Sequence, residues 1–233
     1  MFHPQGPTFL ELARQALSAT DRGYDLLAPK FDFTPFRTPD EVLEAAREYL
    51  EGTGPVGDAL DLCCGTGAVL EALRPVCSRI VGVDFSAGML ELARARYPEA
   101  EFVQREVLSL GYRCEFDLVT CFGGLGHFLA EDKPALVDVV ARALRPGGRF
   151  LFATSQPPAP WDRRLWMAGG FDLAMGLRNR LIRPPFVMYY LNFMLPQALR
   201  MLEDRGFRTE VLRPSQFRSP HDCLRLVVGH WPG

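Results

Sequence analysis

The spacing of hydrophobic residues changes several times along the chain and divides its middle part into short elements. Between residues 59 and 154, short apolar runs alternate with segments whose apolar residues recur at helical spacing. The apolar runs predict strands at 59–61, 79–84, 101–104, 116–122 and 149–154. The segments between them predict helices at 69–73, 87–97 and 132–144. Strands that alternate with helices in this way indicate an α/β fold, in which a parallel sheet is covered on both faces.

Both ends of this region also carry patterned elements. Thr38, Pro39 and Glu41 have the spacing of a capping box, with threonine as N-cap, and predict a helix that runs to about residue 50. After residue 195, a helical pattern runs to Gly206. Closing strands are predicted at 207–212 and 223–230. The sheet therefore continues to the end of the chain.

Two segments lie outside this alternation, and we expect a single domain over 1–233 in which they are elaborations. Residues 1–55 are expected to form a helical cap, with a helical pattern over 8–27 that Gly23 interrupts. Residues 155–195 break the pattern and are rich in aromatic residues, methionine and arginine. We expect them to form an insertion over the sheet.

The sequence Asp61-Leu62-Cys63-Cys64-Gly65-Thr66-Gly67 joins the first strand of the sheet to a helix. Glycine lets the backbone approach a ligand closely, and ligands bind at the carboxyl ends of parallel strands. A dinucleotide fingerprint would need a third glycine where this chain has Leu70. Acidic residues also follow the second and third strands, Asp84 and Glu106. The loop alone therefore indicates a nucleotide-like cofactor and disfavours a dinucleotide.

The composition of the chain limits the classes of partner that it is expected to bind. The formal net charge of -2 and the pI near 6.1 give no basic field that would attract nucleic acid. Six cysteines occur without the paired spacing of a zinc site, so no metal is expected, and we expect reduced thiols in a cytoplasmic protein. The apolar runs are shorter than the roughly 20 residues of a transmembrane helix.

In order and spacing, several of these motifs resemble the class I S-adenosylmethionine-dependent methyltransferase family, over most of the chain. Residues 61–67 are similar to its acid-x-Gly-x-Gly-x-Gly motif, with Cys63 in place of the first glycine. Residues 81–90, 116–119, 144–148 and 202–207 resemble further motifs of the family. The resemblance implies a Rossmann-like sheet of seven strands in the order 3-2-1-4-5-7-6, with strand 7 antiparallel. It also implies S-adenosylmethionine as the cofactor.

The resemblance assigns roles around the nucleoside part of the cofactor. Asp84 would accept hydrogen bonds from the ribose diol, although it could also only stabilise the following helix start. Phe85 and Met89 would enclose the adenine or belong to the core. Glu106 would accept from the adenine amino group, with Val107 donating its backbone N–H.

Other residues would meet the methionine part of the cofactor. Gly65 and Gly67, beside Cys63, would bring the loop backbone close to it, and Asp61 would fix the methionine end or orient the loop. Cys121 and Phe122 would present backbone carbonyls to the ammonium group. Arg37 would hold the carboxylate, and Tyr24 would share that task or face the acceptor; their alternatives are a surface charge and a packed aromatic.

Transfer of a methyl group from a sulfonium mainly requires that the acceptor is aligned with the methyl group and that a proton is removed from the acceptor. His127, in the glycine-rich loop after the fourth strand, is the candidate base, with a purely structural hydrogen bond as its alternative. The insertion would form the acceptor pocket or simply close the core. Its arginines would hold an anionic group of the substrate or touch an anionic membrane surface.

The sequence thus predicts a methyltransferase that acts on an oxygen, nitrogen or carbon of a small, apolar or aromatic acceptor. Two alternatives remain at this level. One is a nicotinamide-dependent oxidoreductase on the same kind of sheet, and the other is a protein that binds S-adenosylmethionine without turnover. The oligomeric state has no signal in the sequence.

Overall fold

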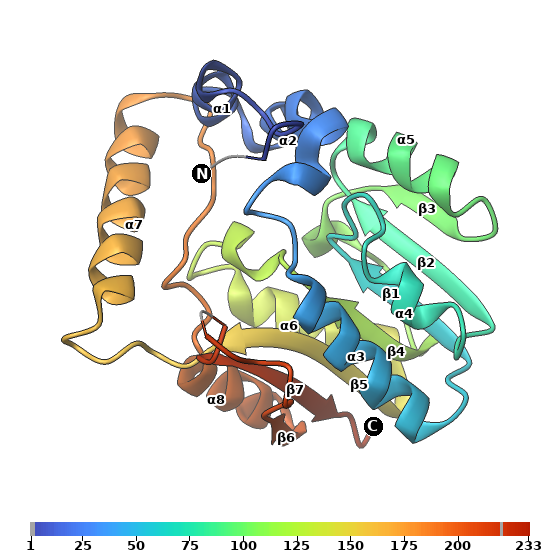
Figure 1. Ribbon diagram of the computed structural model, residues 1–233. Helices are drawn as coiled ribbons and strands as arrows, with labels where there is room; N and C mark the ends of the chain where they lie inside the picture. Colours follow the sequence, from blue (N-terminus) through green and yellow to red (C-terminus); the bar gives the residue numbers. More distant parts are fainter. Residues whose placement is uncertain (1–2, 220) are drawn as a thin grey trace.

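A seven-stranded sheet in the order β3-β2-β1-β4-β5-β7-β6 forms the centre of the molecule (Figure 1). The computed structural model describes residues 3–219 and 221–233. All neighbouring strands pair in parallel except β7, which is antiparallel to both β5 and β6. The predicted order and the antiparallel seventh strand are confirmed. The strands are β1 (Asp58–Leu62), β2 (Arg79–Asp84), β3 (Glu101–Gln104), β4 (Phe116–Cys121), β5 (Leu144–Ser155), β6 (Arg208–Leu212) and β7 (Leu224–His230).

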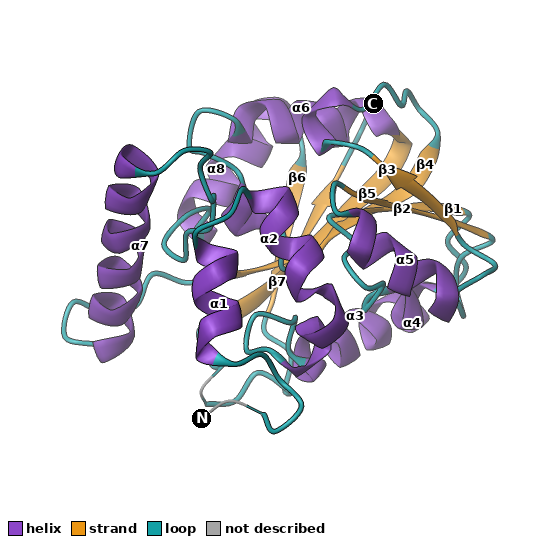
Figure 2. Cartoon of the chain, turned by 90° about the horizontal axis from the view of Figure 1, so that it is seen from above, coloured by secondary structure: helices purple, strands orange, loops and turns teal. Residues whose placement is uncertain are grey.

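Helices cover both faces of the sheet because its central strands are apolar on both sides. One hydrophobic cluster joins the sheet to α6 and α8, and a second joins it to α3 and α4 on the other face. Viewed from above, the strands lie between these helices (Figure 2). The bounds are α3 (Asp40–Thr53), α4 (Leu70–Leu73), α5 (Ala87–Arg96), α6 (Lys133–Ala143) and α8 (Leu195–Arg205), with short 3₁₀ turns η2 (Val107–Ser109) and η3 (Leu125–His127).

The N-terminal segment differs from its prediction in where it breaks. It forms α1 (Phe9–Ala16), α2 (Thr20–Leu27) and the 3₁₀ turn η1 (Ala28–Phe33), so the break lies between α1 and α2. Gly23 instead lies inside α2, where a Cβ atom would come within 2.7 Å of the Phe186 ring. This glycine is required by close packing and does not end a helix.

The capping box predicted at Thr38 is wrong. Helix α3 begins at Asp40, and its N-cap, Pro39, makes no side-chain capping bond. A complete capping box is present instead in α1, where Thr8 and Glu11 cap each other's backbone. Ser86 does cap α5 as expected from its position, accepting a hydrogen bond from the Met89 N–H.

Strand β5 is longer than the apolar pattern predicts. Strand β5 starts at Leu144, directly after α6, and not at Arg149. The Gly147 N–H donates to the Trp231 carbonyl and the Trp231 N–H donates to the Gly148 carbonyl, so the proline-glycine segment is held beside the end of the chain. Gly206, in the left-handed conformation, ends α8 as predicted.

The insertion after β5 contains a long helix that the sequence pattern did not indicate. Helix α7 (Arg163–Leu181) stands at one side of the molecule, and an extended segment, residues 182–194, returns from it to α8 (Figure 1). Of the residues of α7, Met175 is buried. Within residues 3–219 and 221–233, no helix has the length and apolar character needed to cross a membrane.

Candidate cofactor and acceptor site

The loop between β1 and α4 turns with three residues in the left-handed backbone region, Cys63, Gly65 and Gly67, whose φ values are 55°, 53° and 83°. A Cβ atom at Gly67 would lie 2.9 Å from the Tyr97 ring, so glycine is needed there for both reasons. A hydrogen bond with Cys121 and burial raise the pKa of the Cys63 thiol. That thiol therefore stays protonated and is no nucleophile.

Asp84 connects this loop to the start of α5. Its carboxylate accepts the Gly65 N–H at 2.9 Å through Oδ2 and the Ser86 N–H at 2.9 Å through Oδ1. Burial raises its pKa, while these backbone hydrogen bonds oppose the shift. Each carboxylate oxygen has a second lone pair, so the group can still accept from a ligand in the cavity that it lines.

Asp61 is buried at the end of β1 beside β4. Its Oδ1 accepts a hydrogen bond from the Thr120 hydroxyl at 2.7 Å, across a register in which the two residues are paired. Its Oδ2 is buried and has no partner among the described residues. Burial is the main cause that raises the pKa of Asp61 to about 7. An unpaired buried acceptor of this kind fits a cationic or N–H group of a ligand.

Tyr24 and His127 meet over the cavity. The Tyr24 hydroxyl lies 2.8 Å from His127 Nε2, and His127 Nδ1 lies 2.7 Å from the Val187 carbonyl oxygen. A carbonyl can only accept, so Nδ1 carries the proton and Nε2 accepts from the Tyr24 hydroxyl. Burial lowers the pKa of His127, which favours this neutral form, and raises the pKa of Tyr24.

One cavity brings most of these groups together. Of the predicted site residues, those that line it are Tyr24, Arg37, Asp61, Cys63, Gly65, Asp84, Phe85, Met89, Phe122 and His127. They come from the N-terminal segment, the loop after β1, the loop after β2 and the loop after β4. The carboxyl ends of three parallel strands therefore converge on one site.

Known proteins are similar to this chain in sequence. A family model described as a methyltransferase domain matches residues 59–148. A trans-aconitate 2-methyltransferase from Azoarcus sp. (strain BH72) is 33% identical over 184 residues, which are 70% of this chain and 66% of that protein. A ubiquinone biosynthesis O-methyltransferase from Thiobacillus denitrificans is 28% identical over 207 residues, covering 85% and 84%.

The chain belongs to the class I S-adenosylmethionine-dependent methyltransferases. S-adenosylmethionine, which defines that family, is its cofactor, as predicted from the motifs. A demethylmenaquinone methyltransferase from Clavibacter sepedonicus is 38% identical over 121 residues, 50% of this chain. The chain spans about half the length of the demethylmenaquinone methyltransferases it matches.

Solved structures agree in fold. A putative O-methyltransferase from Nostoc punctiforme superposes with a TM-score of 0.68 at 18% identity, covering 92% of this chain and 62% of that one. The DhpI protein, solved with SAM and HEP, superposes with a TM-score of 0.65 at 21% identity, covering 96% and 99%. At such identities the likeness extends to the fold alone.

Four predicted cofactor residues of this methyltransferase lie outside the residues lining the cavity: Gly67, Glu106, Val107 and Cys121. Glu106 is exposed next to η2, and Val107 is buried in the core cluster that also contains Cys121. Their contacts with the cofactor stay predictions.

A second cavity adjoins the first and shares part of its wall. Both are lined by Tyr24, Phe36, Arg37, Thr38, Phe122, Gly123 and His127. Beyond them the second cavity is walled by the extended segment 182–194, including Met188, Tyr189 and Tyr190. The insertion thus faces the same space as the glycine loop, through a junction at Tyr24 and His127.

Two carboxylates that the sequence reasoning missed tie the N-terminal segment to this site. Asp25, on α2, accepts from the Ser86 hydroxyl at 2.6 Å and from the Gly88 N–H at 3.0 Å. Asp32, in η1, accepts from the Thr66 hydroxyl and from Arg96, each at 2.7 Å. Nothing in their sequence surroundings marked them, because their partners lie far along the chain.

Proposed function

We propose that this methyltransferase transfers the methyl group of S-adenosylmethionine to a small, largely apolar acceptor that binds in the second cavity. The observation that carries the proposal is the shared wall of the two cavities, with Tyr24 and His127 at their junction. A donor on one side and an acceptor on the other would meet there. Alignment of this kind is the main requirement of methyl transfer.

The chain offers a partner for each polar part of the cofactor. Asp84 would accept from the ribose hydroxyls, and the buried Oδ2 of Asp61 would accept from the ammonium group. Arg37, whose guanidinium donates to Asp40 at 2.6 Å, has further N–H groups for the carboxylate. Phe85 and Met89 supply apolar surface for the adenine. When bound, the sulfonium supplies an activated methyl group.

The walls of the second cavity favour an aromatic or otherwise apolar acceptor. Methionine and tyrosine side chains of the segment 182–194 supply an apolar wall that suits a flat ring. The relatives are named for demethylmenaquinone, for ubiquinone biosynthesis and for trans-aconitate. Of these, the ring compounds suit the lining of the cavity better than a small acid does.

The neutral His127 is suited to take a proton from the acceptor. Its Nε2 accepts from the Tyr24 hydroxyl, so an acceptor O–H or N–H that donates to the Tyr24 oxygen can pass its proton to that oxygen while Tyr24 passes its own to Nε2. The Val187 carbonyl then stabilises the imidazolium through Nδ1. The acceptor atom, freed of its proton, would then form a bond to the methyl group that the bound sulfonium supplies, while the methyl–sulfur bond breaks and S-adenosylhomocysteine is the other product.

Turnover on a panel of phenols, quinols, amines and trans-aconitate tests this function, with S-adenosylhomocysteine formation as the readout. We expect activity on a ring hydroxyl. His127→Ala and Tyr24→Phe should lower kcat on that acceptor by about 10²-fold or more, because general base catalysis contributes this much. Both variants should still show a thermal shift with S-adenosylhomocysteine. Undiminished turnover in His127→Ala would assign the histidine a structural role.

Thermal shift also separates the alternatives. S-adenosylhomocysteine at about 100 times its dissociation constant should add roughly 2.7 kcal/mol to the stability, and NADH should add nothing. A shift with NADH alone would support an oxidoreductase. A shift with S-adenosylhomocysteine but no methylation of any acceptor, or of any small molecule that co-purifies with the protein, would support a binding protein without turnover.

A further inference from the structure

The outer side of α7 carries a continuous apolar stripe that no described part of the chain covers. Residues at intervals of three and four face solvent along the helix, and the exposed fractions of the large side chains among them run from 57% for Leu177 to 76% for Leu173. The stripe consists of Trp166, Met167, Gly170, Leu173, Ala174, Leu177 and Leu181. Single apolar residues on a surface are ordinary, but a contiguous row of this size marks a contact site.

The inner side of α7 fixes the helix in this orientation. Asp172 accepts from the Tyr190 and Leu191 N–H groups at 2.7 and 2.9 Å, and Asn179 bonds the backbone N–H and carbonyl of Phe186. Arg178 donates to the Ala16 and Ser18 carbonyls of the α1 end. The polar residues of the helix and the buried Met175 therefore bind it to the rest of the molecule, and the apolar residues of its outer side face solvent.

Positive charge lies at both ends of the stripe. Arg163 is exposed at its beginning, and Arg180 and Arg183 are exposed at its end. Within the part of the chain that the structure describes, these three arginines form no salt bridge. The acid of the exposed helix start, Asp162, is already paired with Arg164. The surface is therefore apolar in the middle and cationic at its ends.

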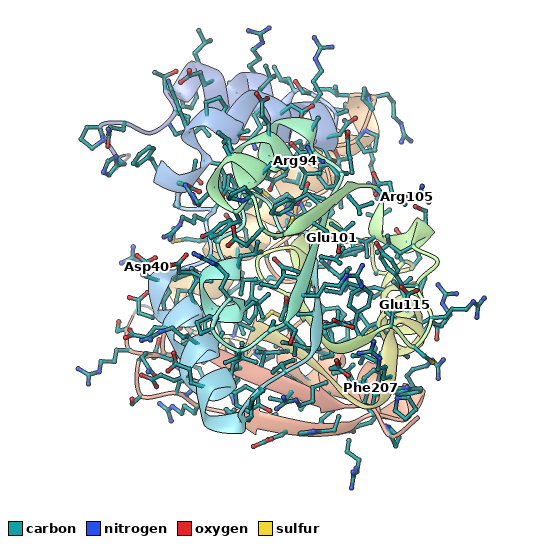
Figure 3. The ribbon with its side chains drawn as sticks, turned by 90° about the vertical axis from the view of Figure 1, so that its right-hand side faces the viewer. Asp40, Arg94, Glu101, Arg105, Glu115 and Phe207 are labelled. Atoms are coloured by element: carbon teal, nitrogen blue, oxygen red, sulfur yellow. The ribbon has the colours of Figure 1, made fainter. Side chains whose placement is uncertain are left out.

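The opposite side of the molecule has a different character. Figure 3, which shows the side away from α7, carries charged side chains of both signs at its labelled positions Asp40, Arg94, Glu101, Arg105 and Glu115. The apolar stripe is thus a local feature and not the general quality of the surface.

Charge also decides between two occupants of the stripe. A second copy of the chain would place α7 against α7, and whether the helices ran parallel or antiparallel, arginines would face arginines at both ends. An anionic lipid surface offers acyl chains to the apolar middle and phosphates to the guanidinium groups. Phe9 and Leu10 of the neighbouring α1 are also exposed, at 79% and 77%, and would extend the contact.

We propose that α7 lies flat in the surface of an anionic membrane, with Trp166, Leu173 and Leu177 at the boundary of the acyl chains and the terminal arginines at the headgroup phosphates. This interaction stands on the exposed helix and does not depend on the identity of the methyl acceptor. Trp161 and Trp166, 86% and 73% exposed, are built-in reporters of it.

Vesicles of equal parts phosphatidylglycerol and phosphatidylcholine, and vesicles of phosphatidylcholine alone, test the proposal. We expect co-sedimentation and a blue shift of tryptophan emission with the anionic vesicles, and binding that weakens as salt is added. The double variant Leu173→Glu/Leu177→Glu should lose at least about 90% of the binding, since it places two charges in the apolar layer. Arg180→Gln/Arg183→Gln should weaken the binding about tenfold or more.

Control variants with the same kinds of substitution at exposed sites outside α7 show whether an effect on vesicle binding is specific to the stripe. Leu92→Glu changes an exposed leucine of α5. Arg208→Gln/Arg213→Gln changes two exposed arginines, one at the start of β6 and one directly after it. Both variants should bind vesicles like the unaltered protein. A thermal shift with S-adenosylhomocysteine checks that each variant is folded. Vesicle binding that survives Leu173→Glu/Leu177→Glu, or no binding by the unaltered protein, would overturn the proposal. If the unaltered protein binds no vesicles but forms dimers without lipid, and only Leu173→Glu/Leu177→Glu abolishes these dimers, the stripe is the contact site for a second copy of the chain.

Discussion

Asp61 has a buried carboxylate oxygen that suits a cationic group of the cofactor. Its Oδ1 accepts from the Thr120 hydroxyl, while Oδ2 is buried and has no partner in the part of the chain that the structure describes. Desolvation makes the ionised form unfavourable, which is why its pKa rises to about 7. A bound ammonium group would reverse this, because an opposite charge nearby favours the carboxylate. Binding of the cofactor should therefore release a proton from Asp61.

The affinity for S-adenosylhomocysteine should accordingly depend on pH. Below pH 7 the protein must lose a proton to bind, so the affinity should rise by up to about tenfold per pH unit and level off above pH 7. Titration calorimetry between pH 5.5 and 7.5, in buffers of different ionisation enthalpy, measures both the affinity and the released proton.

Asp61→Asn is the control for this pH dependence. The amide cannot ionise, so the affinity for S-adenosylhomocysteine should be weaker at pH 7.5 and nearly constant over the pH range.

Asp61 also makes the stability of the protein depend on pH. Between the ordinary pKa of 3.8 and about 7, the folded state of the unaltered protein binds more protons than the unfolded state, so the stability falls as pH rises through that window. Asp61→Asn should be the more stable protein at pH 8 without ligand. A pH-independent affinity in the unaltered protein would remove Asp61 from the ammonium site.

At the scale of elements, α2 packs against the returning segment of the insertion through a glycine. A Cβ atom at Gly23 would lie 2.7 Å from Phe186 Cε2 and 3.1 Å from the Gln15 carbonyl oxygen. Phe186 is 3% exposed and stacks on Tyr24 at 6.0 Å, so it cannot move without displacing the Tyr24 ring. The glycine therefore supports the geometry of the site.

Gly23→Ala should lower the free energy of unfolding by about 1–3 kcal/mol, the usual cost of overpacking. Gly52→Ala is the matched control, since that glycine is also helical and nothing lies within 4 Å of its Cβ position; it should leave stability unchanged or raise it by up to about 1 kcal/mol. Urea denaturation of both variants measures the difference. Equal stabilities would show that the Phe186 contact is relaxed without cost.

The sheet could be predicted from the sequence because most of its strands are short runs rich in apolar residues, separated by segments with helical spacing. Strand β2 and the helix after Ser86 follow directly from such local signals. Helix α7 could not be found in this way, because most of its large apolar residues face outward and its two adjacent glycines and scattered arginines hide the helical period. The prediction of the start of α3 was wrong because Thr38 lines the cavities and does not cap the helix.

The candidate site was predictable where it follows the strand ends. Asp61, Asp84 and the glycines sit at positions that any parallel sheet brings together, so their convergence follows from topology. Thr120 could have been found as a hydroxyl that follows the apolar pair Leu118 and Val119, in the strand that pairs with the strand of Asp61. The partners from the N-terminal segment could not, because a contact between Asp32 and Thr66 depends on how the cap docks and leaves no local pattern.

For the whole molecule, the docked cap couples the N-terminal segment to the cofactor loop. Asp32 holds Thr66 in the glycine loop and Arg96 at the end of α5, and its side chain is 25% exposed. Asp25 holds the first turn of α5, beside Asp84. Tyr24 reaches the cavity from the same segment. Closure of the cap and order of the glycine loop should therefore be linked.

Removing both carboxylates with Asp25→Ala/Asp32→Ala should loosen the cap and weaken S-adenosylhomocysteine binding about tenfold, because hydrogen bonds to charged groups contribute about 1.5–3 kcal/mol and these are partly exposed. Hydrogen exchange should become faster in both α2 and residues 61–67, since each orders the other. Asp21→Ala is the control: this exposed aspartate of α2 has no hydrogen-bond partner among the described residues, and its removal should change neither quantity. If hydrogen exchange becomes faster in α2 while exchange in residues 61–67 and the affinity for S-adenosylhomocysteine stay unchanged, the cap covers the site without ordering the glycine loop.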